Sequence, residues 1–189
     1  MDTSEFWTII EAARSAVGAD KRFDEALVDE LATRTQDDIL RYQERFDEVH
    51  DAMYRWNVWA AAYLVGGGCS DDSFTDFRAG LIALGRDWYE KAAACPDSLA
   101  EHPAVIAAVE VQRDDALFYE EVNYAASEAF ERVTGGGKDF YEAWDEYRAS
   151  RDSTERDADG MGEDFDFDDP HEMRRRLPRL AALCLRDTP

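Results

Sequence analysis

Hydrophobic residues recur every three or four positions along most of this chain, which is the spacing that an amphipathic α-helix produces. The first such run spans residues 3–17 and the second spans residues 23–33. No stretch alternates hydrophobic and polar residues as a half-buried strand requires, and no repeat of fixed period occurs. The pattern therefore predicts an all-α fold, organised as a single-domain helical bundle.

The longest periodic segment runs from residue 35 to residue 65 and predicts one long central helix. Thr35 and Asp38 form a variant of the capping box at its start. Its hydrophobic stripe consists of Ile39, Tyr42, Phe46, Val49, Met53, Trp56, Ala60 and Tyr63. Towards its end the segment is apolar on nearly every side, so we expect this helix to lie at the centre of the bundle.

Three glycines at positions 66–68 interrupt this pattern and are followed by the sequence Cys-Ser-Asp-Asp. Ser70 is a typical N-cap residue. Asp71 and Asp72 would then occupy the first turn of the next helix, where the helix dipole favours negative charge. We therefore interpret the segment as a turn between two helices rather than as an active-site loop. Further helices are predicted over residues 71–84, 86–95, 104–134 and 138–150, with a loop at residues 97–103.

The end of the chain changes character at residue 151. Residues 151–169 are charged and lack a hydrophobic period, so they predict an acidic flexible connector after a helical domain of residues 1–150. Asp169 and Pro170 have the form of an N-cap and a first helical residue. Residues 170–186 predict a short basic amphipathic helix that docks on the bundle or on a partner through its leucines, with its arginines facing an acidic surface.

Composition narrows the classes of function. The chain of 189 residues carries 43 Asp and Glu against 21 Lys and Arg, which gives a formal net charge of -22. This charge repels a phosphate backbone and an anionic membrane surface, so we expect neither nucleic acid nor a membrane as a partner. A basic protein partner is compatible with it. The oligomeric state does not follow from the sequence.

The three cysteines, Cys69, Cys95 and Cys184, have neither the number nor the spacing of a disulfide framework or a zinc site, which favours a reducing compartment. The first residues lack the basic and apolar regions of a secretory signal. The longest apolar run, residues 58–65, is too short to span a bilayer. We therefore expect a cytoplasmic protein.

Five residues outline a candidate pocket: His50, Asn57, Cys69, Asp71 and Asp72. His50 and Asn57 are polar positions on an otherwise apolar strip of the long helix. Because buried polar groups require partners, this pair forms either a structural hydrogen bond or the floor of a pocket. A thiolate at Cys69 would gain from the helix start that follows it, but the two aspartates would raise the pKa of the thiol. We favour a structural role for Cys69 and assign no catalytic residue.

The sequence gives little support for metal or cofactor chemistry. Asp47 and His50 reproduce half of a di-iron motif, but the second copy is absent. Residues 157–168 resemble a calcium loop, yet Met161 stands where a ligand is needed and the last position is not Glu. We predict no cofactor and no metal centre. Cation binding by Asp71 and Asp72, or by residues 157–168, stays an open question.

Three segments of the sequence resemble one known family. "FDEVHDAMYRWNVWAAAYLVGGGCSDDSFTDFRAGLIALGRDWYEKA", "EFWTIIEAAR" and "PDSLA" are similar to the domain-of-unknown-function family 4240. The stretch "AAYLVGGGCSDDSFTDFR" is the most specific part. The resemblance covers about residues 5–147 and implies that they form one domain. It implies no activity and no site residues.

Two functions are compatible with these observations. The first is a non-enzymatic protein-interaction or regulatory module whose acidic surface binds a basic protein; the net charge and the lack of a complete catalytic constellation favour it. The alternative is a small-molecule-binding protein or enzyme with a pocket near the five residues named above and the turn at 66–72. Trp56, Trp59 and Tyr63 could line a ligand site, but aromatic residues at helical spacing usually belong to a core, and we assign them to it.

Overall fold

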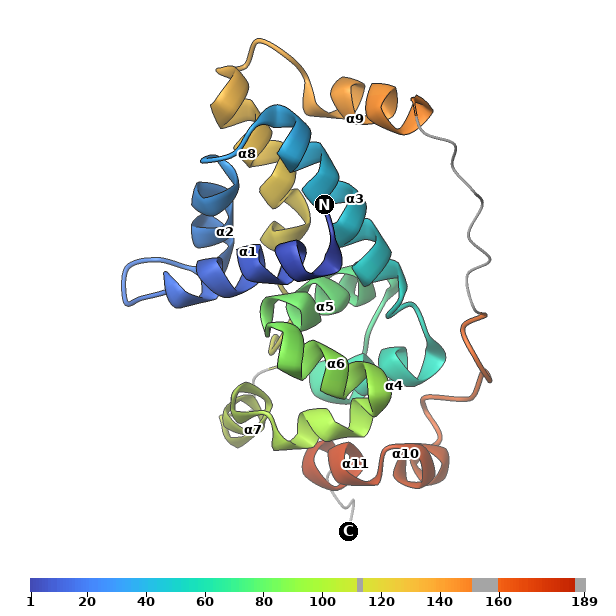
Figure 1. Ribbon diagram of the computed structural model, residues 1–189. Coiled ribbons are helices and arrows are strands. Elements are labelled where there is room, and N and C mark those ends of the chain that lie inside the picture. Colours follow the sequence, from blue (N-terminus) through green and yellow to red (C-terminus); the bar gives the residue numbers. More distant parts are fainter. Residues whose placement is uncertain (112–113, 151–159, 186–189) are drawn as a thin grey trace. The chain divides into compact units, whose positions relative to one another are not determined.

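The computed structural model describes residues 1–111, 114–150 and 160–185, and every regular element in these ranges is a helix (Figure 1). The one strand-like feature in them is an isolated bridge between Gly18 and Lys21. The predicted all-α class is therefore confirmed. No helix in the described ranges is both long enough and apolar enough to cross a membrane. The chain divides into two compact units: unit 1 is Met1–Asp51 with Glu120–Ala158, and unit 2 is Ala52–Tyr119 with Asp159–Pro189.

Unit 1 combines the start of the chain with a later segment. Its elements are α1 (Thr3–Ser15), α2 (Phe23–Leu31), α3 (Gln36–Asp51), η2 (Glu120–Tyr124), α8 (Ala125–Thr134) and α9 (Phe140–Ala149). α8 packs against both α2 and α3, so it completes the core that the first three helices begin. The largest fully buried side chains of this core are Phe6, Ile9, Ile10, Leu27, Leu31, Ile39, Tyr42 and Phe130. The rings of Phe6 and Tyr42 stack with their centroids 5.3 Å apart.

Unit 2 combines the middle of the chain with its end. Its elements are α4 (Trp56–Gly66), α5 (Asp71–Ala83), α6 (Arg86–Ala94), the short 3-10 helix η1 (Pro96–Glu101), α7 (Pro103–Glu110), α10 (Pro170–Arg176) and α11 (Pro178–Cys184). η1 contacts α4, α6, α7 and α11, so it lies at the centre of this unit. Residues 97–103, which were predicted to form a loop, therefore include a helical turn with a buried Leu99.

A close crossing of two segments fixes one side of α5. Leu117 is buried and has a positive φ of 68°, and its carbonyl oxygen would lie 1.8 Å from a Cβ atom built on Gly80. Only glycine leaves room for that approach. Beside it, the N–H of Tyr119 donates to the carbonyl oxygen of Asp76 at 3.2 Å. The segment before η2 is thereby held against α5.

The predicted single helix over residues 35–65 is wrong, because α3 ends at Asp51 and α4 begins at Trp56. No glycine or proline marks this break. Instead, Nη2 of Arg55 donates to the carbonyl oxygen of Ala93 near the end of α6 at 2.8 Å. The N–H of Trp56 donates to the carbonyl oxygen of Met161 at 2.9 Å. Both bonds satisfy groups that helix ends leave without intrahelical partners, so distant segments stabilise the break.

Several helix ends follow the predicted local chemistry. Ser70 caps α5 by accepting the N–H of Ser73 at 3.2 Å, and Gly67 ends α4 in the left-handed conformation, so the predicted end of one helix and start of the next are found at these residues. Asp169 caps α10 as expected. The helices predicted over residues 104–134 and 170–186 are both interrupted. The second breaks at Leu177, because the residue before a proline is disfavoured in the helical conformation.

Candidate functional site

The helical strip predicted to carry His50 and Asn57 is not continuous, because the two residues belong to different helices. His50 lies near the end of α3 in unit 1, where it is 8% exposed and its ring stacks on Phe46 with centroids 5.5 Å apart. Asn57 is exposed in the first turn of α4 in unit 2. The strip that motivated the pocket required one continuous helix, and that helix is divided. A depression of about 310 Å³ between α8 and α9 is lined by none of the five residues.

Cys69 is half-buried in the turn between α4 and α5. Its carbonyl oxygen accepts the Nε1–H of Trp59 at 3.1 Å. The pKa of the Cys69 thiol is raised to about 12, mainly by burial and to a smaller extent by Asp76 and Asp71. Asp71 and Asp72 are exposed in the first turn of α5. Within the described ranges, no group of three or more His, Cys, Asp or Glu side chains is placed to hold a metal ion.

A larger group of polar and aromatic contacts lies where residues near the end of the chain pack on the other helices of unit 2. We call residues 160–185 the C-terminal arm. Residues 151–159 of the predicted flexible connector lie outside the described residues. Residues 160–169, in contrast, pack on α4, and α11 packs on η1, α4 and α7. The arm therefore has two attachment points, one aromatic and one built around a carboxylate.

The aromatic attachment point is on α4. The ring of Phe167 lies edge-on to the ring of Trp56, with their centroids 6.0 Å apart. Its centroid also lies 5.6 Å from that of Tyr63 and 6.4 Å from that of Trp59. The hydroxyl of Tyr63 donates to the carboxylate of Asp168, and this bond is the main cause that raises the pKa of Tyr63. Trp56, Trp59 and Tyr63, which we assigned to the core, thus form a half-buried surface that the arm covers.

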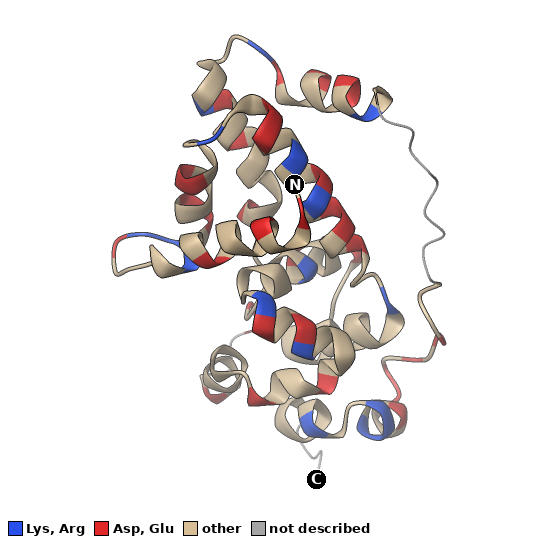
Figure 2. Ribbon diagram, viewed as in Figure 1, with Lys and Arg blue, Asp and Glu red and all other residues tan. Residues whose placement is uncertain are grey.

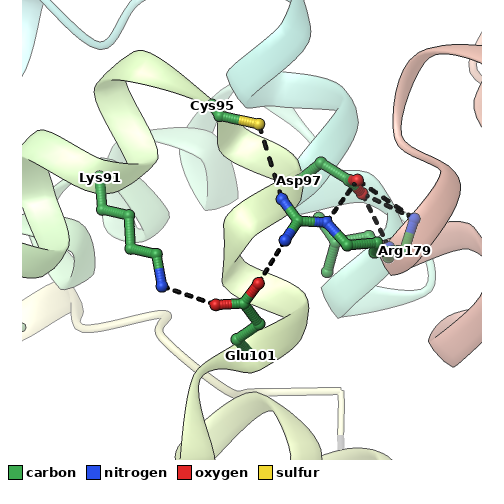
Figure 3. Close-up of polar contacts among 6 residues, drawn as sticks. Lys91, Cys95, Asp97, Glu101 and Arg179 are labelled. Carbon is green, nitrogen blue, oxygen red and sulfur yellow. Dashed lines mark hydrogen bonds and ion pairs between the residues drawn. The ribbon is translucent and has the colours of Figure 1, made fainter.

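The second attachment point is the carboxylate of Asp97 in η1 (Figure 3). Asp97 is 5% exposed. One of its oxygens accepts the main-chain N–H groups of Arg179 at 3.0 Å and Leu180 at 2.8 Å, and the other accepts Nε–H of Arg179 at 3.0 Å. The carboxylate therefore serves as the N-terminal cap of α11, supplied by a residue from far earlier in the chain, and it pairs with the arginine at the same place.

Neighbouring side chains complete this polar cluster. The guanidinium of Arg179 also pairs with Glu101, and Nη2 of Arg179 lies 3.7 Å from the sulfur of Cys95. Lys91 donates to the other oxygen of Glu101 at 2.7 Å, and this bond is the main cause that lowers the pKa of Glu101. The bond to Asp97 is the main cause that raises the pKa of Arg179. Charge and hydrogen bonding thus select a cation at this position of the arm.

Apolar side chains of the arm are buried close to the Asp97 cluster. The arm residues Met173, Leu177, Leu180 and Ala181 are all at most 2% exposed. Leucines of the arm are therefore part of the core of unit 2, where α11 packs on η1, α4 and α7. The arm therefore combines one charge pair with Asp97 and a set of buried apolar side chains.

Two other arginines of the arm, Arg175 and Arg176, have acidic partners within the arm itself. Arg175 and Arg176 both donate to Glu172 of the same helix, and Arg176 also pairs with Glu163 at 3.0 Å and lies over the ring of Phe165. The bonds from Arg175 and Arg176 lower the pKa of Glu172 to about 2. Figure 2 shows these arginines gathered on α10 beside acidic residues of the preceding segment. Arg175 and Arg176 are thus neutralised by acidic residues of the arm itself.

Sequence reasoning missed Asp97 and the start of α11. The signal for the helix start was present, because Pro178 suits the first position of a helix. Asp97 gave no such signal: the residues that it binds lie 82 and 83 positions later in the chain.

These features describe an all-helical protein in which the C-terminal arm packs on α4, η1 and α7. The chain belongs to the family described as "Protein of unknown function (DUF4240)", whose model matches residues 1–132. This confirms the resemblance, although the match ends earlier than expected. No curated protein and no solved structure matches the sequence. The family match includes α4 and Asp97 but stops before the arm.

Proposed function

We propose that this chain is a non-enzymatic protein-interaction module whose binding surface is the part of unit 2 that carries Asp97. The surface accepts a helical segment of another protein that has an arginine and a leucine in its first turn. The observation that carries this proposal is the buried carboxylate of Asp97, which accepts the main-chain N–H groups of a helix start together with the guanidinium of its arginine.

The chemistry of this contact supports recognition of a segment rather than of a small molecule. A carboxylate that meets two main-chain N–H groups reads the start of a helix, because those groups have no intrahelical partners. The guanidinium adds a requirement for arginine at one position, since it offers several donors in a fixed geometry. A buried leucine beside it adds apolar area, and Leu180 is fully buried here. The excess of acidic residues also favours a basic partner.

Binding in trans tests the proposal directly. We would release the arm in the full-length chain with Arg179→Glu and Leu180→Asp, because both changes oppose the carboxylate of Asp97. The probe is a fluorescent synthetic peptide of residues 160–185 with the natural sequence. We expect saturable binding, measured by fluorescence anisotropy, that weakens as salt increases because the contact includes a charge pair.

Two controls make the result specific. A peptide that carries Arg179→Glu should bind at least about tenfold more weakly, since it places a negative charge against Asp97. The arm-released chain that also carries Asp97→Asn should lose affinity for the natural peptide. Absence of binding by an arm-released chain whose near-ultraviolet circular dichroism shows a folded core would refute the proposed function.

A further inference from the structure

The surface that binds the arm and the arm itself belong to different parts of the chain. Both attachment points, the aromatic one on α4 and the carboxylate of Asp97, lie within residues 1–132 that match the family. The arm begins at residue 160, beyond that match. Every hydrogen bond described for the carboxylate of Asp97 comes from arm residues. A segment outside the family domain therefore occupies its most specific polar site.

Three of the ion pairs described for the arm lie within it, and two join it to η1. Arg175 and Arg176 have their partners within the arm, namely Glu172 and Glu163. Arg179 is the arm residue for which ion pairs with the preceding domain are described, and its side chain is 45% exposed. Ion pairs of such exposed groups are weakened by solvent. On the domain side, in contrast, release removes all the described partners of the Asp97 carboxylate.

We infer that the arm is an intramolecular competitor that holds the binding surface closed until a partner segment displaces it. This inference rests on the proposed function. The partner has the chemistry of the arm: an arginine and a leucine in the first turn of a helix, and an aromatic residue ahead of them that reaches Trp56 and Trp59. Because the arm is tethered, its effective concentration at the surface is on the order of millimolar. A partner in solution must overcome that advantage.

The test compares two full-length chains, the natural sequence and the arm-released variant with Arg179→Glu and Leu180→Asp. Both are titrated with the labelled peptide of residues 160–185. We expect the natural chain to bind the peptide at least about tenfold more weakly than the variant, because its own arm occupies the surface. A second variant, Phe167→Ala, weakens the aromatic attachment and should give an intermediate affinity.

The outcomes separate the two proposals. Equal affinity of the natural chain and the arm-released variant would overturn competition by the arm while leaving the proposed function intact. No binding by either chain would refute the proposed function as well. A dimer of the natural chain that dissociates on Asp97→Asn would show that the arm docks on a second copy, and would also overturn competition within one chain.

Discussion

Asp97→Ala should detach α11 without unfolding the rest of unit 2. The change removes the cap of α11 and leaves the buried N–H of Leu180, now 2.8 Å from a carboxylate oxygen, without a partner. Loss of an N-cap costs about 1 kcal/mol, and an unsatisfied buried N–H costs about 1–3 kcal/mol. These effects overlap, so we expect the docking of α11 to weaken by roughly 2–3 kcal/mol.

Asp97→Asn provides the matched comparison. The amide oxygen can still accept from the two main-chain N–H groups, but the amide nitrogen then faces Nε–H of Arg179, and two donors cannot bond. We expect a loss of about 1 kcal/mol, because the helix cap survives and the charge does not. Arg179→Ala should weaken docking less than Asp97→Ala, since its guanidinium is partly exposed and its main-chain N–H remains.

Native-state hydrogen exchange measures these differences at the right place. A weakening of 2–3 kcal/mol should accelerate exchange of the α11 amides by roughly 30- to 150-fold. Amides of α5 should keep their exchange rates, because the change is confined to the arm. If Asp97→Ala left the exchange of the Leu180 amide unchanged, the carboxylate would not be the group that holds α11. Equal acceleration in α5 would show general destabilisation instead of release.

Three further predictions concern other parts of the chain. Gly80→Ala should destabilise the protein by about 3 kcal/mol or more in urea unfolding, because its Cβ would overlap the carbonyl group of Leu117. The control Gly18→Ala has no atom within 4 Å of the added Cβ and should change stability by less than about 1 kcal/mol. Equal effects of the two substitutions would contradict the close approach of Leu117 to α5. Iodoacetamide at neutral pH should label the exposed Cys95 before Cys69, as judged by mass spectrometry, because burial raises the pKa of Cys69 to about 12; faster labelling of Cys69 would contradict this. Burial raises the pKa of Asp47, so its stabilising contribution is present below the unfolded pKa and is lost as the pH rises through the folded pKa. Asp47→Asn should therefore gain stability in urea unfolding relative to the natural chain as the pH rises above the unfolded pKa of Asp47, and a difference that stays constant with pH would contradict this.

The sequence predicted the features that depend on neighbours along the chain. The helical class follows from periodicity, and the caps at Ser70 and Asp169 follow from residue types at helix starts. The turn at residues 66–72 was predictable for the same reason. The raised pKa of Cys69 was expected from adjacent aspartates, whereas burial proved to be its larger cause.

The features that depend on distant segments were not predictable in this way. The break between α3 and α4 is stabilised by carbonyl groups of Ala93 and Met161. Residues 52–55 contain no glycine or proline that would predict it. The His50/Asn57 strip failed with that helix. Asp97 looked like an ordinary loop residue, because its partners lie more than 80 positions away. The arginines of α10 were expected to face an acidic surface, and the pairs of Arg175 and Arg176 with Glu172 and Glu163 of the arm itself were not predicted.

The mismatch between the family boundary and the arm has a practical consequence for anyone who isolates the domain. A fragment ending at residue 132 keeps the aromatic face of α4 and the floor against which Leu177 and Leu180 pack, yet lacks the segment that covers them. Uncovered apolar surface of this kind promotes self-association. Such a fragment also lacks α9, whose Phe140 packs on Phe130, so only the insolubility that the separate arm peptide reverses would come from the uncovered face of α4.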